Sequence, residues 1–273
     1  MNNIIHPTAI IGKNVQIGKN ITIGPFCHIE GNITIGDNTK LHSNVVISGS
    51  TKIGKNNIFF PFSVIGITPQ DLKFDSELST VEIGDNNIFR EHVTIHSGTN
   101  KGNKASNIYN LTKISNNSLF MVGCHIAHDC YLQNNIILAN NATLAGHVTI
   151  EEHVIIGGLS AIQQFVRIGA YSIIGGMSGV ESNVVPFSLV SGERATLNGI
   201  NIIGLKRHNF SLKEIKIIKS AINKIFNETE HTLSERVEKV SREHSNDNNI
   251  NLLIKFIKEQ TNKSFCKTRK NEK

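Results

Sequence analysis

The chain has 273 residues, of which 39% are hydrophobic, so it is long and apolar enough to bury a core, which excludes a wholly disordered chain. Only 6% of the residues are aromatic and none is Trp, so the core must consist mainly of aliphatic side chains. The net charge is +6, and residues 198–273 hold 16 basic and 9 acidic residues, against 12 and 13 in residues 1–197. The positive charge therefore belongs to the C-terminal segment.

The sequence shows no sign of membrane insertion or export. No apolar run approaches the roughly 18 residues of a membrane span, and the N-terminus lacks the charged and apolar regions of a secretory signal. This predicts a cytoplasmic protein without a membrane span. The four cysteines, Cys27, Cys124, Cys130 and Cys266, are widely spaced and form no CxxC pair, so free thiols are expected.

An aliphatic or Phe residue recurs every six positions from Ile5 to Ile65. The period resumes at Ile83 and, after a shift, runs from Ile114 to Val180. Six residues match neither the helical period nor simple strand alternation. Two segments interrupt the repeat, near residues 67–80 and 100–112, and such interruptions of a solenoid are usually projecting loops, often on the functional face.

The repeat resembles that of the hexapeptide-repeat proteins, whose fold is a left-handed parallel β-helix with three hexads in each triangular coil of about 18 residues. The resemblance implies a mainly β fold with its aliphatic column pointing inward and with residues 18 positions apart stacked along the axis. Parallel-strand spacing puts such residues roughly 4.8 Å apart.

The hexads stop after Pro186, and helical spacing begins near Phe210. Ser211 with Glu214, and Thr232 with Glu235, are possible capping boxes, and a third helix is expected around residues 253–257. The sequence thus predicts a β-helix over residues 1–190 with loops near 67–80 and 100–112. A small helical domain with a basic tail is expected over residues 191–273.

Six of the twelve histidines lie between residues 92 and 153, most densely in the string CHIAHDC from Cys124 to Cys130. A metal ion would need three or four ligand atoms within about 2.0–2.3 Å. Cys124 and Cys130 hold the same position in successive hexads and therefore belong on different faces, so no metal site is expected. A hexapeptide-repeat carbonic anhydrase remains an alternative, with zinc bound by histidines from the set His92, His96, His125, His128 and His147.

His128 shares one column with Gly146 and Gln164, because they are third residues of hexads that start one coil apart. An imidazole one coil from a glycine backbone supplies the two groups that acyl transfer needs, a base for the nucleophile and an N–H for the developing oxyanion. A His is suited to the base role because its ordinary pKa, near 6.5, leaves it largely neutral at neutral pH.

The strings HIAHDC, ILANNATLAGHV, IIGGLSAIQQF, IGGMSGV and NGINIIGLKRHNF, with HPTAIIG near the start and PQDLK in the first loop, resemble the UDP-N-acetylglucosamine O-acyltransferase family of lipid A biosynthesis. The resemblance covers nearly the whole chain. It implies a homotrimer that transfers a 3-hydroxyacyl group from acyl carrier protein to the glucosamine 3-hydroxyl of UDP-N-acetylglucosamine. The site would lie between adjacent β-helices, and no cofactor is implied beyond the phosphopantetheine that carries the acyl group.

The same resemblance assigns roles to individual residues. His128 would be the general base, Asp129 its support and Gly146 the oxyanion donor. Because neighbours in a strand point to opposite faces, Asp129 can support His128 only at a corner or across the trimer. Gly176 would limit the acyl chain, and the remaining substrate-binding residues would be Gln70, Asp71, Lys73, His96, His125, His147, Gln164, Asn201 and Arg207.

Several positions depart from the family pattern, namely Gln163, Arg194, Ile203 and His208, which puts the nucleotide contacts in doubt. The second interruption is longer than usual, and a basic, Asn-rich insert is typical of a mobile loop. Two other functions remain open: an N-acyltransferase that acts on an amino-sugar nucleotide, and a noncatalytic hexapeptide-repeat scaffold. Nucleic-acid binding is not expected, since the basic residues are not interleaved with aromatic ones.

Overall fold

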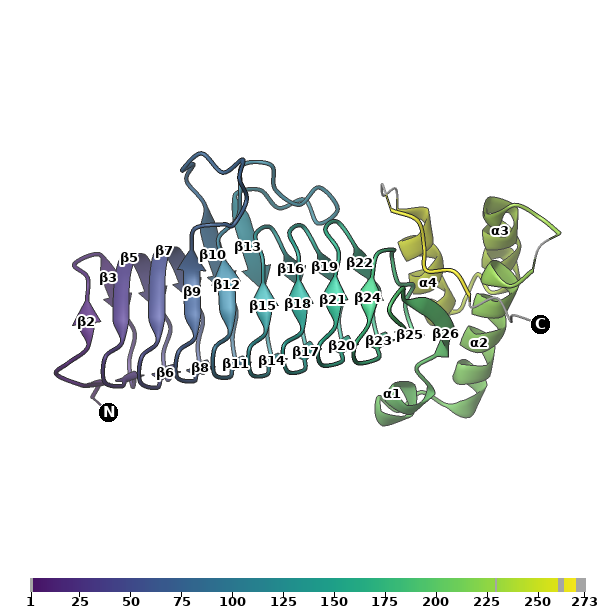
Figure 1. The fold of residues 1–273 in the computed structure, drawn as a ribbon. Helices are drawn as coiled ribbons and strands as arrows, with labels where there is room; N and C mark the ends of the chain where they lie inside the picture. Colours follow the sequence, from purple (N-terminus) through teal and green to yellow (C-terminus); the bar gives the residue numbers. More distant parts are fainter. Residues whose placement is uncertain (1, 229, 260–262, 269–273) are drawn as a thin grey trace.

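The computed structural model describes residues 2–228, 230–259 and 263–268 (Figure 1). A long column of short strands leads into a group of helices at the C-terminal end, and two loops project from one side of the column. The last residues of the expected basic tail, 269–273, lie outside the described residues.

The elements follow one another in chain order. The strands are β1 (Ile4–Ile5), β2 (Ile10–Ile11), β3 (Val15–Ile17), β4 (Thr22–Ile23), β5 (His28–Ile35), β6 (Lys40–Leu41), β7 (Val46–Ile53), β8 (Ile58–Phe59), β9 (Val64–Ile67), β10 (Thr80–Ile83), β11 (Ile88–Phe89), β12 (Thr94–His96), β13 (Leu111–Ile114), β14 (Leu119–Phe120), β15 (His125–Ile126), β16 (Tyr131–Leu132), β17 (Ile137–Leu138), β18 (Thr143–Leu144), β19 (Thr149–Ile150), β20 (Ile155–Ile156), β21 (Ala161–Ile162), β22 (Arg167–Ile168), β23 (Ile173–Ile174), β24 (Gly179–Val180), β25 (Ser188–Ser191) and β26 (Thr196–Ile200). The helices are α1 (Ile202–Arg207), α2 (Leu212–Phe226), α3 (Leu233–Glu243) and α4 (Asn248–Lys258).

The strands form a parallel β-helix, as the resemblance to the hexapeptide-repeat proteins implied. One sheet of 11 strands runs from β1 to β26, and a second sheet of 15 strands covers the other two faces. All the named strands pair in parallel except β25 with β26. The larger sheet turns its corner within the eight-residue strands β5 and β7, where Gly31 and Gly49 have φ angles of +128° and +68°. A Cβ on Gly31 would lie 2.1 Å from the carbonyl oxygen of Gly49, so this corner requires glycine.

The strand register explains where the hexad frame shifts. In the regular coils, Ile137 pairs with Ile155 and Ile155 with Ile173, and each step is one coil of three hexads. Where the loops project, the steps are longer, because Ile53 pairs with Ile83 and Ile83 with Ile114. The connection at residues 68–79, hereafter the first loop, adds two whole hexads and preserves the frame. The connection at residues 97–110, the second loop, adds one residue more than a whole number of hexads, so the frame after it is shifted by a single position.

The core of the coil is an aliphatic column with one aromatic stack. Phe59, Phe89 and Phe120 are fully buried, with successive ring centroids 4.6 and 4.9 Å apart. The inward residues of the regular strands, such as Leu138 and Ile156, are also fully buried. This confirms the inward column that the resemblance to the hexapeptide-repeat proteins implied.

Asparagine recurs because the corners need residues that tolerate positive φ. Asn20, Asn38 and Asn56 occupy equivalent corners with φ angles of 57–59°. Asn is among the few residues that adopt this conformation readily. Their side-chain amides also form a ladder, with N–H donated from each to the next at 3.1 Å, and Asn56 continues it to Asn86 at 3.0 Å.

The helices confirm both capping boxes. The hydroxyls of Ser211 and Thr232 accept the N–H of Glu214 and Glu235, and each Glu side chain accepts the N–H of its cap residue. The third expected helix is α4, while α1 was not predicted. Beyond α4, the chain returns to the coil, where the Asn183 N–H donates to Ser264 O at 2.8 Å.

All four cysteines are free, as expected, and all four are buried. Burial raises the pKa of Cys124 to about 11 and that of Cys130 to about 12. A search of the described part of the chain finds no helix long and apolar enough to cross a membrane.

The inward column gives a test on one strand. Ile156→Ala should lower the free energy of unfolding by about 2–5 kcal/mol, because Ile156 is fully buried. Its neighbour Ile155 points outward and is half-buried, so Ile155→Ala should cost about 1 kcal/mol or less. Denaturant midpoints measure both variants, and equal shifts would contradict the assignment of inward and outward faces.

Candidate active site

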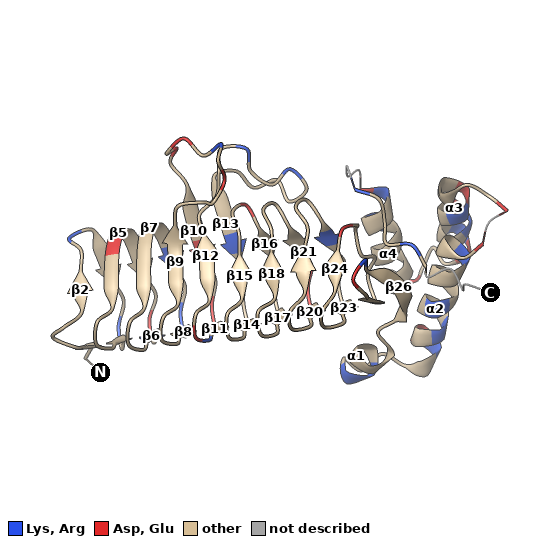
Figure 2. Cartoon of the chain, in the orientation of Figure 1, with Lys and Arg blue, Asp and Glu red and all other residues tan. Residues whose placement is uncertain are grey.

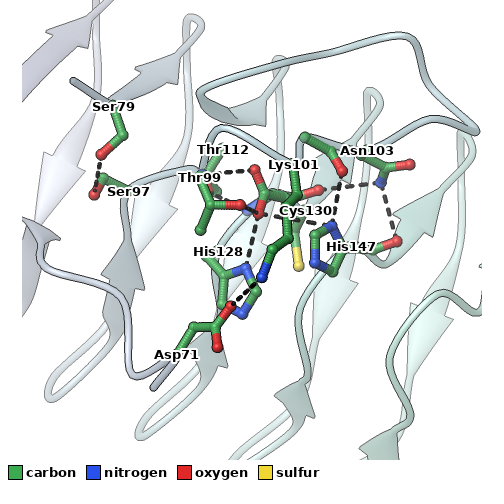
Figure 3. A network of polar contacts seen from close by, with 12 residues as sticks. Asp71, Ser79, Ser97, Thr99, Lys101, Asn103, Thr112, His128, Cys130 and His147 are labelled. Carbon is green, nitrogen blue, oxygen red and sulfur yellow. Dashed lines mark hydrogen bonds and ion pairs between the residues drawn. The ribbon is translucent and has the colours of Figure 1, made fainter. Parts of the chain in front are cut away.

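His128 and Asp129 lie at the corner between β15 and β16, beneath the two loops (Figure 3). Asp129 has a φ of +59°, which turns its side chain away from the strand alternation. The two side chains therefore meet within one chain, with His128 Nδ1 2.8 Å from Asp129 Oδ2. Both residues are buried. Asp129 therefore supports His128 from a corner of the same chain and not across a trimer.

The second loop and β13 hold Asp129 in place. The backbone N–H of Thr99 donates to Oδ1 at 2.8 Å and its hydroxyl to Oδ2 at 2.7 Å. The Asp129 N–H donates to the Thr112 hydroxyl at 2.8 Å. A carboxylate only accepts, so a neutral His128 carries its proton on Nδ1 and keeps the lone pair of Nε2.

The imidazole of His128 lies over the backbone of Gly146. A Cβ on Gly146 would lie 2.6 Å from His128 Nε2 and 2.5 Å from Cε1, so any side chain there would collide with the imidazole. The column that the hexad arithmetic predicted for these two residues is confirmed. Among the described residues, the Gly146 N–H and the His128 Nε2 have no hydrogen-bond partner.

Three further histidines surround His128. The His147 ring stands edge-on to it at 4.9 Å and stacks on Phe165 at 4.5 Å. His147 Nδ1 is 2.9 Å from the Gly102 carbonyl oxygen, and burial lowers its pKa. His96 and His125 meet edge-on at 4.7 Å. Burial lowers the pKa of His125, and burial with the neighbouring histidines lowers that of His96 to about 4.

The first loop brings Asp71 toward His128, where it meets a residue that the sequence analysis missed (Figure 3). Asp71 Oδ2 lies 3.6 Å from the Lys101 ammonium of the second loop, and the Lys73 N–H donates to Asp71 Oδ1 at 3.0 Å. The hydrogen bond from the Lys73 N–H is the main cause of the lowered pKa of Asp71, and the nearby Lys101 and His128 lower this pKa further. Lys101, Thr99 and Gly102 lie in an aperiodic loop, so no sequence signal placed them here.

The remaining predicted residues are not in this cluster. The Gln70 and Lys73 side chains are exposed on the first loop, and Gln164 is exposed one coil beyond Gly146. Gly176 follows β23 of the 11-stranded sheet and therefore lies on another corner, beside Gly158. Asn201 is buried and caps α1, and Arg207 is exposed in the last turn of that helix.

Ligand atoms of His128, Asp129 and His147 lie within 4.8 Å of one another, close enough to be tested as a metal site. The Gly102 carbonyl can only accept, so a neutral His147 carries its proton on Nδ1 and keeps its lone pair on Nε2. The Asp129 carboxylate already accepts three hydrogen bonds. His92 stacks on Phe62 at 5.2 Å. These hydrogen bonds orient both rings for proton transfer, whereas the zinc alternative predicts stoichiometric metal in the purified protein.

The parallel β-helix of six-residue repeats agrees with two family models that the chain matches. Residues 14–49 and 32–66 match the family described as bacterial transferase hexapeptide (six repeats). Residues 183–266 match the second domain of UDP-N-acetylglucosamine O-acyltransferase.

Curated relatives and solved structures cover almost the whole chain. The acyl-(acyl-carrier-protein) UDP-N-acetylglucosamine O-acyltransferase of Rickettsia canadensis is 44% identical over 265 residues, 97% of this chain and 98% of the relative. The enzyme of the same name from Bartonella henselae is 38% identical over 96% of this chain and 93% of its own. The structure of UDP-N-acetylglucosamine O-acyltransferase from Moraxella catarrhalis has a TM-score of 0.90 at 37% identity, covering 96% and 99% of the two chains. The chain belongs to the UDP-N-acetylglucosamine O-acyltransferase family.

The depressed pKa of His96 predicts a stability that depends on pH. Its folded pKa of about 4 lies below the ordinary 6.5, so the unfolded chain binds the proton more readily between these values. The stability should therefore fall as the pH drops from about 6.5 toward 4. Over that pH window, the melting temperature of His96→Gln should fall less than that of the wild type, as measured by circular dichroism. An equal fall in melting temperature in both proteins would show that His96 does not contribute to the pH dependence.

Proposed function

We propose that this chain transfers a 3-hydroxyacyl group from acyl carrier protein to the glucosamine 3-hydroxyl of UDP-N-acetylglucosamine, the first step of lipid A biosynthesis, in the cytoplasm. The observation that carries the proposal is the arrangement of the His128 imidazole. Its Nδ1 is bound by Asp129, its Nε2 is free, and the ring packs over the Gly146 backbone. The names of the full-length relatives support the same substrates.

The chemistry can be derived from that geometry. His128 Nε2 removes the proton from the 3-hydroxyl as its oxygen attacks the thioester carbonyl carbon. The carbonyl oxygen becomes an oxyanion, which the free Gly146 N–H stabilises. When the C–S bond breaks, the phosphopantetheine thiolate takes the proton back from His128. Asp129 stabilises the imidazolium between these two transfers.

The residues around His128 are suited to hold uncharged parts of the substrates. Burial lowers the pKa of His96, His125 and His147, so these imidazoles are neutral near pH 7 and can donate or accept hydrogen bonds. We assign the sugar and acyl contacts to them and to Asp71, with Gln70, Lys73 and Gln164 at the exposed edge. The carrier phosphopantetheine is the one prosthetic group that this reaction needs.

The rest of the predicted site supports a shared cleft. Gly176 lies on a different corner from His128, so the two can line one acyl groove only if neighbouring protomers meet there. This favours a homotrimer with sites between adjacent coils. Asn201 uses its amide to cap α1 and to bond Tyr171 O at 2.9 Å, so we expect it to position α1, and through it Arg207, at the nucleotide.

The C-terminal helices suit an acidic carrier protein. Lys and Arg residues lie on α1, α2 and α3, with acidic residues among those of α3, whereas the coil and its loops carry residues of both signs (Figure 2). Opposite charge steers association without fixing the reacting groups. We propose that the carrier protein docks on this basic region.

His128→Ala should lower kcat by about 10²- to 10⁴-fold, because it removes the base while the coil keeps its core. The assay follows product by mass spectrometry with UDP-N-acetylglucosamine and 3-hydroxyacyl carrier proteins. His28→Ala, which changes an exposed histidine on another coil, is the matched control. Near wild-type turnover by His128→Ala would refute the mechanism, and product only with an amino-sugar acceptor would favour the N-acyltransferase.

Gly176→Met should shift the donor preference toward shorter acyl chains. A Cβ at this position would make a tight contact, 3.3 Å from Gly158 O, so the backbone must shift by a few tenths of an ångström, and the rest of the side chain can then extend from the exposed corner. There it would block the groove that we assign to the acyl chain. Competition between donors of different length measures the shift, and an unchanged preference would place the acyl chain elsewhere.

A further inference from the structure

The second loop is joined to the active site by one buried side chain, Asn103. Although the loop is basic and rich in Asn, Asn103 is only 2% exposed, and its backbone pairs with Ile108 in a small bridge within the loop. The Asn103 amide nitrogen lies 3.1 Å from Asp129 O, 3.0 Å from His147 O and 3.1 Å from the Thr149 hydroxyl. Its Oδ1 accepts the Ser106 N–H at 3.3 Å. Figure 3 shows the amide pointing down onto the corner.

The backbone pairing of the coil provides no donor for the two carbonyls that Asn103 binds, as far as the described residues show. At each corner, the ladder uses the carbonyl of the residue before the positive-φ position, as where the His147 N–H donates to His128 O and the Phe165 N–H to Gly146 O. The carbonyls of Asp129 and His147, both at positive φ, receive no backbone N–H from the described residues. Under the second loop, a carbonyl without a donor would be costly. The Asn103 amide supplies both donors.

These two carbonyls belong to the residues that surround His128. Asp129 binds the imidazole Nδ1, and His147 lies one coil further, against the imidazole edge. The adjacent Gly102 carbonyl accepts the His147 Nδ1 proton, and Thr99 binds the Asp129 carboxylate. A single loop thereby fixes the backbone of both corners and the orientation of both side chains.

We propose that Asn103 is a positioning residue that locks the Asp129 and His147 corners together and so holds His128 over Gly146. The proposal rests on the proposed function, since it assigns Asn103 to the same reaction. It makes the second loop part of the active site. Small displacements of a catalytic group cost large factors in rate, so the effect should appear in kcat.

The sharpest variant is Asn103→Asp, which keeps the shape but replaces the donating NH₂ by an oxygen that faces two carbonyls. We expect kcat to fall by about tenfold or more, with the KM for UDP-N-acetylglucosamine within about threefold of wild type. Asn100→Ala, an exposed Asn in the same loop whose side chain makes no hydrogen bond among the described residues, should leave kcat unchanged. Wild-type kcat in Asn103→Asp would overturn the proposal.

A second measurement is independent of turnover. In ¹⁵N-histidine-labelled protein, the low-field proton on His128 Nδ1 reports its hydrogen bond to Asp129, and we expect Asn103→Asp to shift or broaden it. An unmoved resonance would overturn the proposal. If wild type makes no product but this resonance moves, the proposed function fails while the positioning role stands. Should Asn103→Asp not fold, Asn103→Ala removes both amide donors without placing an oxygen against the two carbonyls, and an unchanged kcat and resonance there would overturn the proposal.

Discussion

The whole structure depends on the parallel register of short strands, which repeats once per coil of three hexads wherever no loop projects. Each inward aliphatic side chain packs on its equivalents above and below, and the amides of the strands find carbonyls one coil away. Once this register is set, every residue of the regular coils belongs to a fixed column at a fixed height. The meeting of His128 and Gly146 is a direct consequence, because two third positions one coil apart must stack.

The two loops lengthen their coils without breaking the parallel pairing. After each loop, the next strand pairs with the equivalent strand of the preceding coil, as where Ile83 pairs with Ile53 and Ile114 with Ile83. The coil can therefore carry polar groups on long connections while its core remains closed. The loops also exclude solvent from one corner. There the carbonyls and the carboxylate of the coil take donors from Thr99 and Asn103, whereas equivalent exposed corners can use water.

Periodic features of this molecule could be predicted from its sequence, whereas most aperiodic ones could not. The six-residue repeat, through its resemblance to the hexapeptide-repeat proteins, predicted the β-helix, the buried column and the pair His128 and Gly146, and the capping boxes predicted the starts of α2 and α3. The contact of His128 with Asp129 depends on a positive φ at Asp129, which strand alternation cannot indicate. Lys101 and Asn103 lie in an aperiodic loop, where position depends on tertiary contacts. The six-residue helix α1 is too short to show a helical period.

Charge is divided between the two parts of the molecule in a way that matches the proposed reaction. The histidines packed near His128 have lowered pKa values, so they stay neutral and add no positive charge beside the base. The ammonium of Lys101, which the second loop brings to this site, is paired with the Asp71 carboxylate. A carrier protein is instead attracted over a distance, which requires exposed charge, and the basic residues of α1 and α2 provide it (Figure 2). The charge that attracts the donor therefore lies on the helices, away from His128.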